Sequence, residues 1–147
     1  MNCSCIVQVD HYGEDDDTFE VLTVSHPTAK KKHKCNECRR EILPGERYEV
    51  QRYSANHNLE THTTCSTCLE IRDIFFCDGY VYGWMYDNFN DSLYDDGCDL
   101  SEACIASLSS EARAVVCGFI ENCWESYRKE EESMSEIYEN INNKYVL

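Results

Sequence analysis

The sequence predicts an α+β fold on three observations. Two Cys-x-x-Cys pairs, Cys35/Cys38 and Cys65/Cys68, stand with 26 residues between them. Short apolar or alternating runs before and between these pairs are typical of β-strands. After residue 80, apolar residues recur at helical spacing. We therefore expect strands in the first part of the chain and helices in the second.

The first 29 residues predict a β-hairpin. The segments 6–9 and 19–24 have the length and apolar content of strands, and the polar, turn-rich segment 12–18 joins them. His26 and Pro27 end this extension.

The next 50 residues predict a turn, a second hairpin and a helix. Strands are expected over 47–53 and 59–63, with a loop at 54–58. A helix is expected over 65–76, with Thr64 or Ser66 as its N-terminal cap. The first cysteine pair then precedes the hairpin, and the second pair begins the helix.

The two cysteine pairs together predict a metal site. Four thiolates suit a structural Zn²⁺ ion, which prefers tetrahedral sulfur coordination. We expect Cys35, Cys38, Cys65 and Cys68 to bind one zinc ion, with no open position for catalysis. Two disulfides or two redox pairs are the competing interpretation, and we do not favour it because nothing indicates a secretory context.

Two other metal arrangements remain open at this point. His62 stands three residues before Cys65, so the set Cys35, Cys38, His62 and Cys65 is an alternative. A second site formed by Cys3 and Cys5 with a histidine is also possible from spacing alone. Apart from the four zinc ligands, we expect the cysteines to be reduced and to act as small buried apolar residues.

The order of a zinc knuckle, a β-hairpin and a helix defines the treble-clef arrangement. The chain resembles treble-clef fingers of the LIM and PARP-finger kind in its two cysteine pairs, in 42–46 (Ile-Leu-Pro-Gly-Glu) and in His62-x-x-Cys65. It is also similar to small uncharacterised zinc-binding proteins of bacteriophages, which share the basic lead-in and the run found here at 34–48. The resemblance covers roughly residues 29–95. It implies the fold and leaves the activity open, because a fold does not determine a function.

The remaining residues predict helices. Tyr82, Met85, Tyr86, Phe89 and Leu93 lie on one face of a helix over 82–95. A short helix is expected from Asp99 to Glu102 onward, and a longer one over 110–130 with its own apolar face. A separate last helix is expected around 134–141.

The formal net charge of −15 is unevenly distributed. Residues 30–53 have eight basic and four acidic residues, whereas the segments before and after are acidic. One feature of the acidic part is a row of aspartates, Asp87, Asp91 and Asp95, which lies on the predicted helix 82–95 opposite its apolar face. We expect the partner-binding surface there and just beyond it, at Asp87, Asp91, Asp95, Asp96 and Asp99. The competing interpretation is an ordinary solvated face.

These features predict a non-catalytic, zinc-stabilised interaction protein. It would be phage-encoded, as the resemblance implies, and would bind and modulate or inhibit a host protein that has a basic surface. An acidic surface can imitate a phosphate backbone and so act as a nucleic-acid mimic.

Two alternative functions are weighed against this prediction. The first is direct nucleic-acid binding through the basic residues around the first cysteine pair, which are Lys30, Lys31, Lys32, Lys34, Arg39 and Arg40. We expect nucleic acid to be repelled by the rest of the chain. The second is a nuclease-like treble-clef enzyme, suggested by His57, Asn58 and His62, whose spacing does not fit such a site.

Length and composition predict one domain with three parts, which are a hairpin extension (1–29), the finger (30–80) and an acidic helical part (81–147). The start of the sequence does not resemble a signal peptide, and no apolar run is long enough to span a membrane. We therefore expect a cytoplasmic protein, in the host cell if it is phage-encoded. The oligomeric state is left open.

Overall fold

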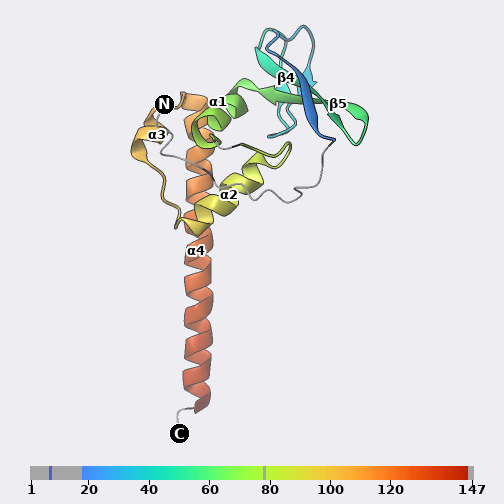
Figure 1. The fold of residues 1–147 in the computed structure, drawn as a ribbon. Helices are drawn as coiled ribbons and strands as arrows, with labels where there is room; N and C mark the ends of the chain where they lie inside the picture. The colour runs from blue at the N-terminus through green and yellow to red at the C-terminus, as the bar shows by residue number, and fades with distance from the viewer. Residues whose placement is uncertain (1–6, 8–17, 78, 146–147) are drawn as a thin grey trace.

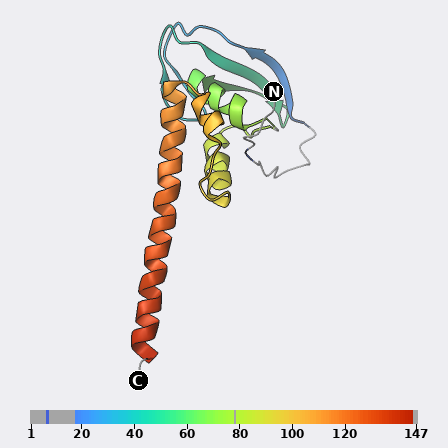
Figure 2. The same cartoon turned by 90° about the vertical axis from the view of Figure 1, so that its left-hand side faces the viewer.

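The computed structural model of the chain is a mixed α/β structure. It describes Val7, residues 18–77 and residues 79–145. A small antiparallel sheet lies at one end, short helices pack beside it, and one long helix projects away from this body (Figures 1 and 2). The elements are β1 (Glu20–Ser25), β2 (His33–Lys34), β3 (Glu41–Ile42), β4 (Tyr48–Ala55), β5 (Asn58–Cys65), α1 (Ser66–Phe75), α2 (Met85–Asp95), α3 (Glu102–Ala106) and α4 (Ser110–Tyr145).

The β4–β5 hairpin is the central element of the sheet. Its antiparallel pairing runs from Tyr48↔Cys65 to Ala55↔Asn58. Only Asn56 and His57 form the turn, and both have positive φ (49° and 63°), as a type I′ turn requires. The expected loop over 54–58 is therefore shorter, because asparagine and histidine tolerate this backbone conformation and the strands continue to the turn.

The expected N-terminal hairpin can be followed only in its second strand, because nearly all of the first strand lies outside the described residues. The strand at 20–25 exists, but it pairs with β4 in the sheet order β1-β4-β5, with an irregularity between Val21 and Thr23. Of the first expected strand, only Val7 lies within the described residues. It is buried, and its backbone N–H donates to the carbonyl of Phe75 (2.8 Å). The hydrophobic pattern identified the strand but could not identify its neighbour.

The helix α1 begins where the hairpin ends. Cys65 is both the last residue of β5 and the N-cap of α1, and no side chain caps the helix. The expected cap by Thr64 or Ser66 is therefore wrong. Cys68, Ile71 and Phe75 form the buried face of the helix.

The helix α2 confirms the expected apolar face, because Met85, Phe89 and Leu93 are buried. The long helix α4 corrects the expectation of two separate helices, since it continues without a break over the 36 residues Ser110–Tyr145. No proline interrupts this segment. Its first half packs on α1 and α2, whereas its second half projects from the body (Figures 1 and 2).

The cysteines outside the metal cluster differ from the expectation of reduced thiols. Cys98, which follows α2, forms a disulfide with Cys123 of α4. Cys77 and Cys104 are also disulfide-bonded. Among the described cysteines, Cys117 is the free thiol outside the metal cluster. The disulfides could not be deduced from spacing, because several pairings are compatible with one sequence.

Candidate metal centre

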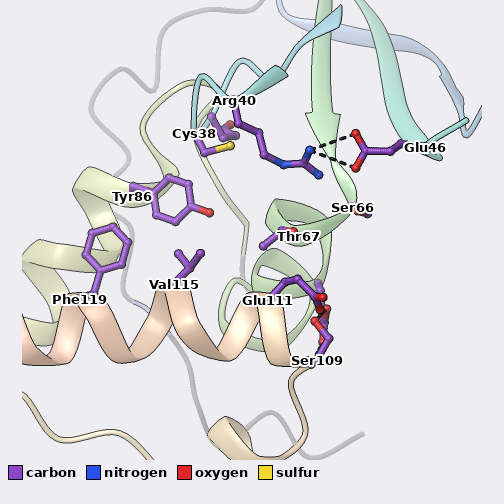
Figure 3. A pocket seen from close by; sticks show the side chains of 12 residues that line it. Cys38, Arg40, Glu46, Ser66, Thr67, Tyr86, Ser109, Glu111, Val115 and Phe119 are labelled. Atoms are coloured by element: carbon purple, nitrogen blue, oxygen red, sulfur yellow. Dashed lines mark hydrogen bonds and ion pairs between the residues drawn. The ribbon is translucent and has the colours of Figure 1, made fainter. Parts of the chain in front are cut away.

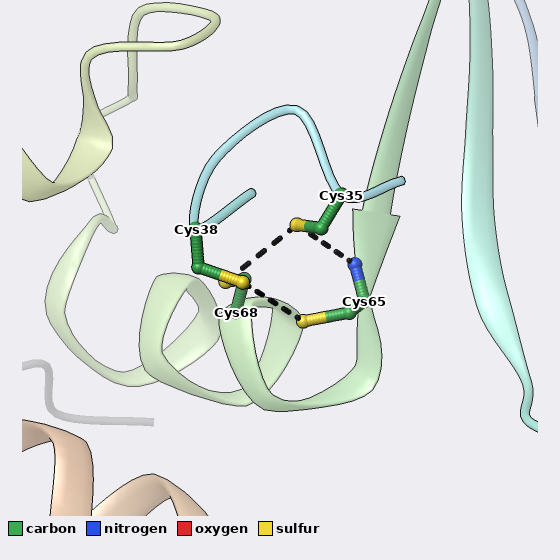
Figure 4. Close-up of side chains that lie close together, drawn as sticks. All are labelled: Cys35, Cys38, Cys65 and Cys68. Carbon is green, nitrogen blue, oxygen red and sulfur yellow. Dashed lines mark hydrogen bonds between the residues drawn. The ribbon is translucent and has the colours of Figure 1, made fainter. Parts of the chain in front are cut away.

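Four cysteines from two parts of the chain meet beside the sheet. Cys35 and Cys38 lie in the turn between β2 and β3, and Cys65 and Cys68 lie at the start of α1 (Figure 4). Their four sulfur atoms all lie within 4.8 Å of one another. The predicted ligand set is therefore brought together, and it could bind one metal ion, for which zinc is the typical choice.

The sulfur positions fit a tetrahedral ion. Cys35 Sγ lies 3.8 Å from Cys68 Sγ, and Cys38 Sγ lies 3.8 Å from Cys65 Sγ. A tetrahedron with Zn–S bonds of about 2.3 Å has edges of about 3.8 Å. Cys35, Cys65 and Cys68 are buried and Cys38 is half-buried, as suits a closed structural site.

The turn that holds the first pair is defined by its backbone. The Cys35 N–H donates to the carbonyl of Arg40, and the Arg39 N–H donates back to the carbonyl of Cys35. Arg39 has φ of 67°, so the chain reverses immediately after Cys38. This geometry directs both sulfurs of the turn toward α1 (Figure 4).

Within this cluster the sulfur contacts favour the thiolate form of Cys35, whereas they raise the pKa of Cys38 and of Cys68. Side-chain hydrogen bonds from Cys38, Cys65 and Cys68 hold the pKa of Cys35 well below its usual value, and the Cys65 N–H also donates to Cys35 Sγ (3.4 Å). The first N–H groups of α1 have no partner within the helix, and the helix dipole is positive at this end. Both effects lower the cost of placing negative charge on the sulfurs.

His62 is not grouped with the four sulfurs. Its Nε2 donates to Glu37 Oε1 (2.9 Å), and its ring stacks on Tyr82 with 4.2 Å between ring centres. Glu37 in turn accepts the backbone N–H groups of Gly83 and Met85. Glu37 thus links the cysteine turn to the hairpin and to the start of α2, an arrangement that we did not predict.

Tyr86 is a second contact that sequence reasoning missed. Its hydroxyl donates to Cys68 Sγ (3.0 Å), and its ring stacks on Phe119 of α4. Burial, followed by the neighbouring Cys68, raises the pKa of Tyr86, so that the hydroxyl keeps its proton. Tyr86 therefore connects the metal cluster to both α2 and α4.

A cavity of about 850 Å³ opens beside the cluster. Cys38, Arg40 and Thr67 line one side of it, and Tyr86 and Phe119 line the other (Figure 3). Each of the five charged side chains on its wall already has a hydrogen-bond partner; for example, Arg40 pairs with Glu46 (3.1 Å), and Glu70 accepts from Ser109. The charged groups of the cavity are therefore engaged in holding the fold together.

The acidic residues lie apart from the metal cluster. Asp87, Asp91 and Asp95 are exposed on α2, Asp96 is its C-cap, and Asp99 lies in the connection to α3. None of these carboxylates takes part in the ion pairs of the described residues. They are an exposed group on α2 and in the connection that follows it.

The basic residues near the cysteines are partly neutralised. Lys32 pairs with Glu41 (3.3 Å) and Arg40 pairs with Glu46. Lys30, Lys31, Lys34 and Arg39 are exposed.

The remaining predictions concern the nuclease-like residues, the possible second metal site and membrane spans. His57 and Asn58 lie at the tip of the hairpin, at the opposite end of β5 from Cys65. Cys3 and Cys5, the residues of the possible second metal site, lie outside the described residues. No helix in the described part of the chain combines the length and the apolar character needed to cross a membrane.

Comparison with protein-family models, curated proteins and solved structures finds no match to this chain.

Proposed function

We propose that this chain is a zinc-stabilised interaction protein built on a treble-clef finger, and that it acts by binding a partner with a basic surface. The finger would comprise the β2–β3 turn, the β4–β5 hairpin and α1. Its four thiolates would saturate the ion and leave no coordination position for water. The metal would therefore have a structural role, and the protein would not be an enzyme.

The exposed carboxylates of α2 are the observation that supports this function. The helix buries Met85, Phe89 and Leu93, so Asp87, Asp91 and Asp95 face solvent in an i, i+4, i+8 row. Like charges at this spacing destabilise a helix by about 0.2–0.5 kcal/mol per pair. A cationic groove on a partner would relieve this repulsion, form charge-assisted hydrogen bonds and accelerate association.

A regular row of negative charges can also imitate a nucleic-acid backbone. The resemblance to phage zinc-binding proteins suggests that the partner is a host protein that normally binds nucleic acid, and that its activity is inhibited or modulated. Direct nucleic-acid binding through Lys30, Lys31, Lys34 and Arg39 is the alternative. It is less favoured, because the chain has a net charge of −15 and would repel phosphates elsewhere on its surface.

The test compares two variants that change the net charge equally. Asp87, Asp91 and Asp95 are each replaced by lysine in one variant, and Glu132, Glu136 and Glu139 of α4 are replaced by lysine in the other. The probe is a synthetic Lys/Arg-rich polypeptide, and its affinity is measured by calorimetry at low and at physiological salt with zinc-loaded protein. We expect the α2 variant to lose binding and the α4 variant to retain it. Equal losses in both variants would show that only net charge matters and would contradict the proposed surface.

A further inference from the structure

The outer half of α4 has an exposed apolar stripe. Met134, Ile137, Tyr138, Ile141 and Tyr145 are each between 47% and 74% exposed. At 100° per residue they fall within an arc of about 100° on one side of the helix. Glu132, Glu136 and Glu139 fall on the opposite side. We refer to residues 130–145 as the tail helix.

The stripe continues the face that packs on the body. In the inner half of α4, this face buries Ala112, Val116 and Cys123. At its outer limit the body contributes Tyr94, whose ring stacks on Tyr127 and whose hydroxyl donates to Glu130. The tail helix then leaves the body, as both views of the fold show (Figures 1 and 2). A helix of this length with an uncovered apolar face is only marginally stable in water by itself.

We propose that the tail helix pairs with the tail helix of a second copy of this chain, in antiparallel orientation and centred on Ile137. This interaction surface is separate from the acidic residues of α2 and does not depend on the function proposed above. Antiparallel pairing places Met134 against Ile141 of the second copy, and Ile137 close to its own equivalent. The two zinc-binding bodies lie at opposite ends of the helix pair, so they do not collide.

Charge complementarity selects the second copy and its direction. Glu130 and Lys144 lie on the same side of the centre of the stripe, Glu130 within its arc and Lys144 just outside it, and they are 14 residues or about four helical turns apart. An antiparallel pair centred on Ile137 brings Lys144 of each copy beside Glu130 of the other. A parallel pair in register would instead bring the two Glu130 side chains together and leave each Lys144 about four helical turns from the Glu130 of the other copy, and like charges in such positions oppose pairing.

The length of the apolar stripe determines how tightly we expect two copies to bind each other. The contact spans about four turns of helix on each copy, and we expect it to bury less surface than the roughly 1,200–2,000 Å² of a standard stable interface. We therefore expect a reversible dimer with a dissociation constant in the range of about 1–100 µM.

The experiment uses the full zinc-loaded chain without reductant. All variants have the Cys117→Ser change, because a free thiol on α4 could otherwise link two copies covalently. Sedimentation equilibrium from about 1 µM to about 1 mM measures the dissociation constant. The stripe variant replaces Met134, Ile137 and Ile141 by glutamine, which keeps helix propensity. The matched control is Glu136→Lys on the opposite face.

We expect the stripe variant to weaken dimerisation by at least about a hundredfold and the control to dimerise at least as well as the parent chain. A parent chain that stays monomeric up to the highest concentration would overturn the proposal. The stripe would then be a candidate binding surface for a different protein. A dimer that is unaffected by the stripe variant would overturn it equally.

Charge reversal tests whether the two tail helices pair in antiparallel orientation. Lys144→Glu should weaken the dimer several-fold, and the double variant E130K/K144E should restore it, because the opposite charges still meet across an antiparallel pair. Tyr94→Phe controls for the hydrogen bonds that Glu130 accepts in the body. If the double variant dimerises no better than Lys144→Glu alone, the antiparallel arrangement is wrong.

Discussion

Arg72 of α1 and Glu49 of β4 form a bidentate ion pair inside the body. Arg72 Nη1 and Nη2 donate to the two carboxylate oxygens of Glu49 at 2.7 and 2.8 Å. Glu49 also accepts from Gln51, and the guanidinium group lies over the ring of Tyr80. Both ionic side chains are largely buried. Because Arg72 stands four residues after Cys68, this pair attaches the metal-binding helix to the hairpin at a second point.

Replacing Arg72 by methionine should destabilise the protein by about 3–5 kcal/mol, because Glu49 would remain buried with only the half-exposed His26 as an ionisable partner (3.1 Å). The double variant E49M/R72M should recover part of this loss. Urea unfolding of zinc-loaded protein measures both. Lys129→Met is the control, since it removes an exposed pair with Glu125 and should change the free energy of unfolding little. Similar losses of unfolding free energy for Arg72→Met and Lys129→Met would show that the buried pair stabilises the protein no more than an exposed pair does.

The same pair predicts a pH dependence. Burial opposes ionisation of Glu49, but the hydrogen bonds and charge of Arg72, together with the hydrogen bonds from Gln51 and His26, outweigh it and hold the pKa of Glu49 below its ordinary value of 4.5. A lowered pKa in the folded state stabilises the protein above the unfolded pKa, and this contribution is lost as pH falls through the folded value. The stability difference between the parent chain and Glu49→Gln should therefore be constant at neutral pH and shrink below about pH 4.5. A difference that grows on acidification would contradict this assignment.

Replacing Cys65 by serine should abolish zinc binding and unfold the segment around residues 35–77. Structural zinc sites contribute an apparent binding free energy of about 10–16 kcal/mol in small fingers. Metal analysis and circular dichroism measure the two effects. Cys117→Ser should keep one zinc equivalent, since this thiol lies outside the cluster. His62→Ala should also keep the metal, whereas loss of zinc there would favour the ligand set that includes histidine.

Removing the Cys98–Cys123 disulfide should lower stability by about 3 kcal/mol, because the bond closes a loop of 25 residues in the unfolded chain. The double variant C98S/C123S is compared with the parent chain by denaturant unfolding, with zinc content checked in both. In a reducing buffer the two proteins should become equally stable. A difference that persists after reduction would mean that serine packs poorly at these positions and that the bond itself contributes little.

The isolated protein should not bind DNA or RNA at physiological salt, given its overall charge of −15. Fluorescence anisotropy with labelled single- and double-stranded oligonucleotides provides the measurement. Salt-sensitive micromolar binding that disappears when Lys30, Lys31 and Lys34 are changed to glutamate would support the alternative function.

The cysteine cluster could be predicted from the sequence, because ligand spacing reflects the local chemistry of a single ion. Cys35 and Cys38 need only one turn to converge, and so do Cys65 and Cys68. The apolar face of α2 was predictable for a similar reason, since helical periodicity is a local property. The expected strands 47–53 and 59–63 also exist, although the turn between them is tighter than the polar residues suggested.

Long-range pairing could not be predicted. Nothing in residues 20–25 indicates that β4 is their neighbour, because alternation defines a strand and not its partner. The Glu49–Arg72 pair and the Glu37–His62 pair join residues that are 23 and 25 positions apart. The separate helices expected over 110–130 and around 134–141 are one helix, because no proline or glycine stands between them and ordinary differences in helix propensity cost only tenths of a kcal/mol per residue.

The position of Cys65 has a consequence for how the strands of the hairpin align. Cys65 is paired with Tyr48 at the end of the β4–β5 ladder. Sliding β5 past β4 by one residue would turn every β5 side chain to the other face of the sheet. The Cys65 sulfur would then point away from Cys35 and Cys38, and four ligands could not be assembled. Four ligands for one ion are thus compatible with a single alignment of the two strands, so a zinc ion bound during folding would select this alignment over the shifted ones.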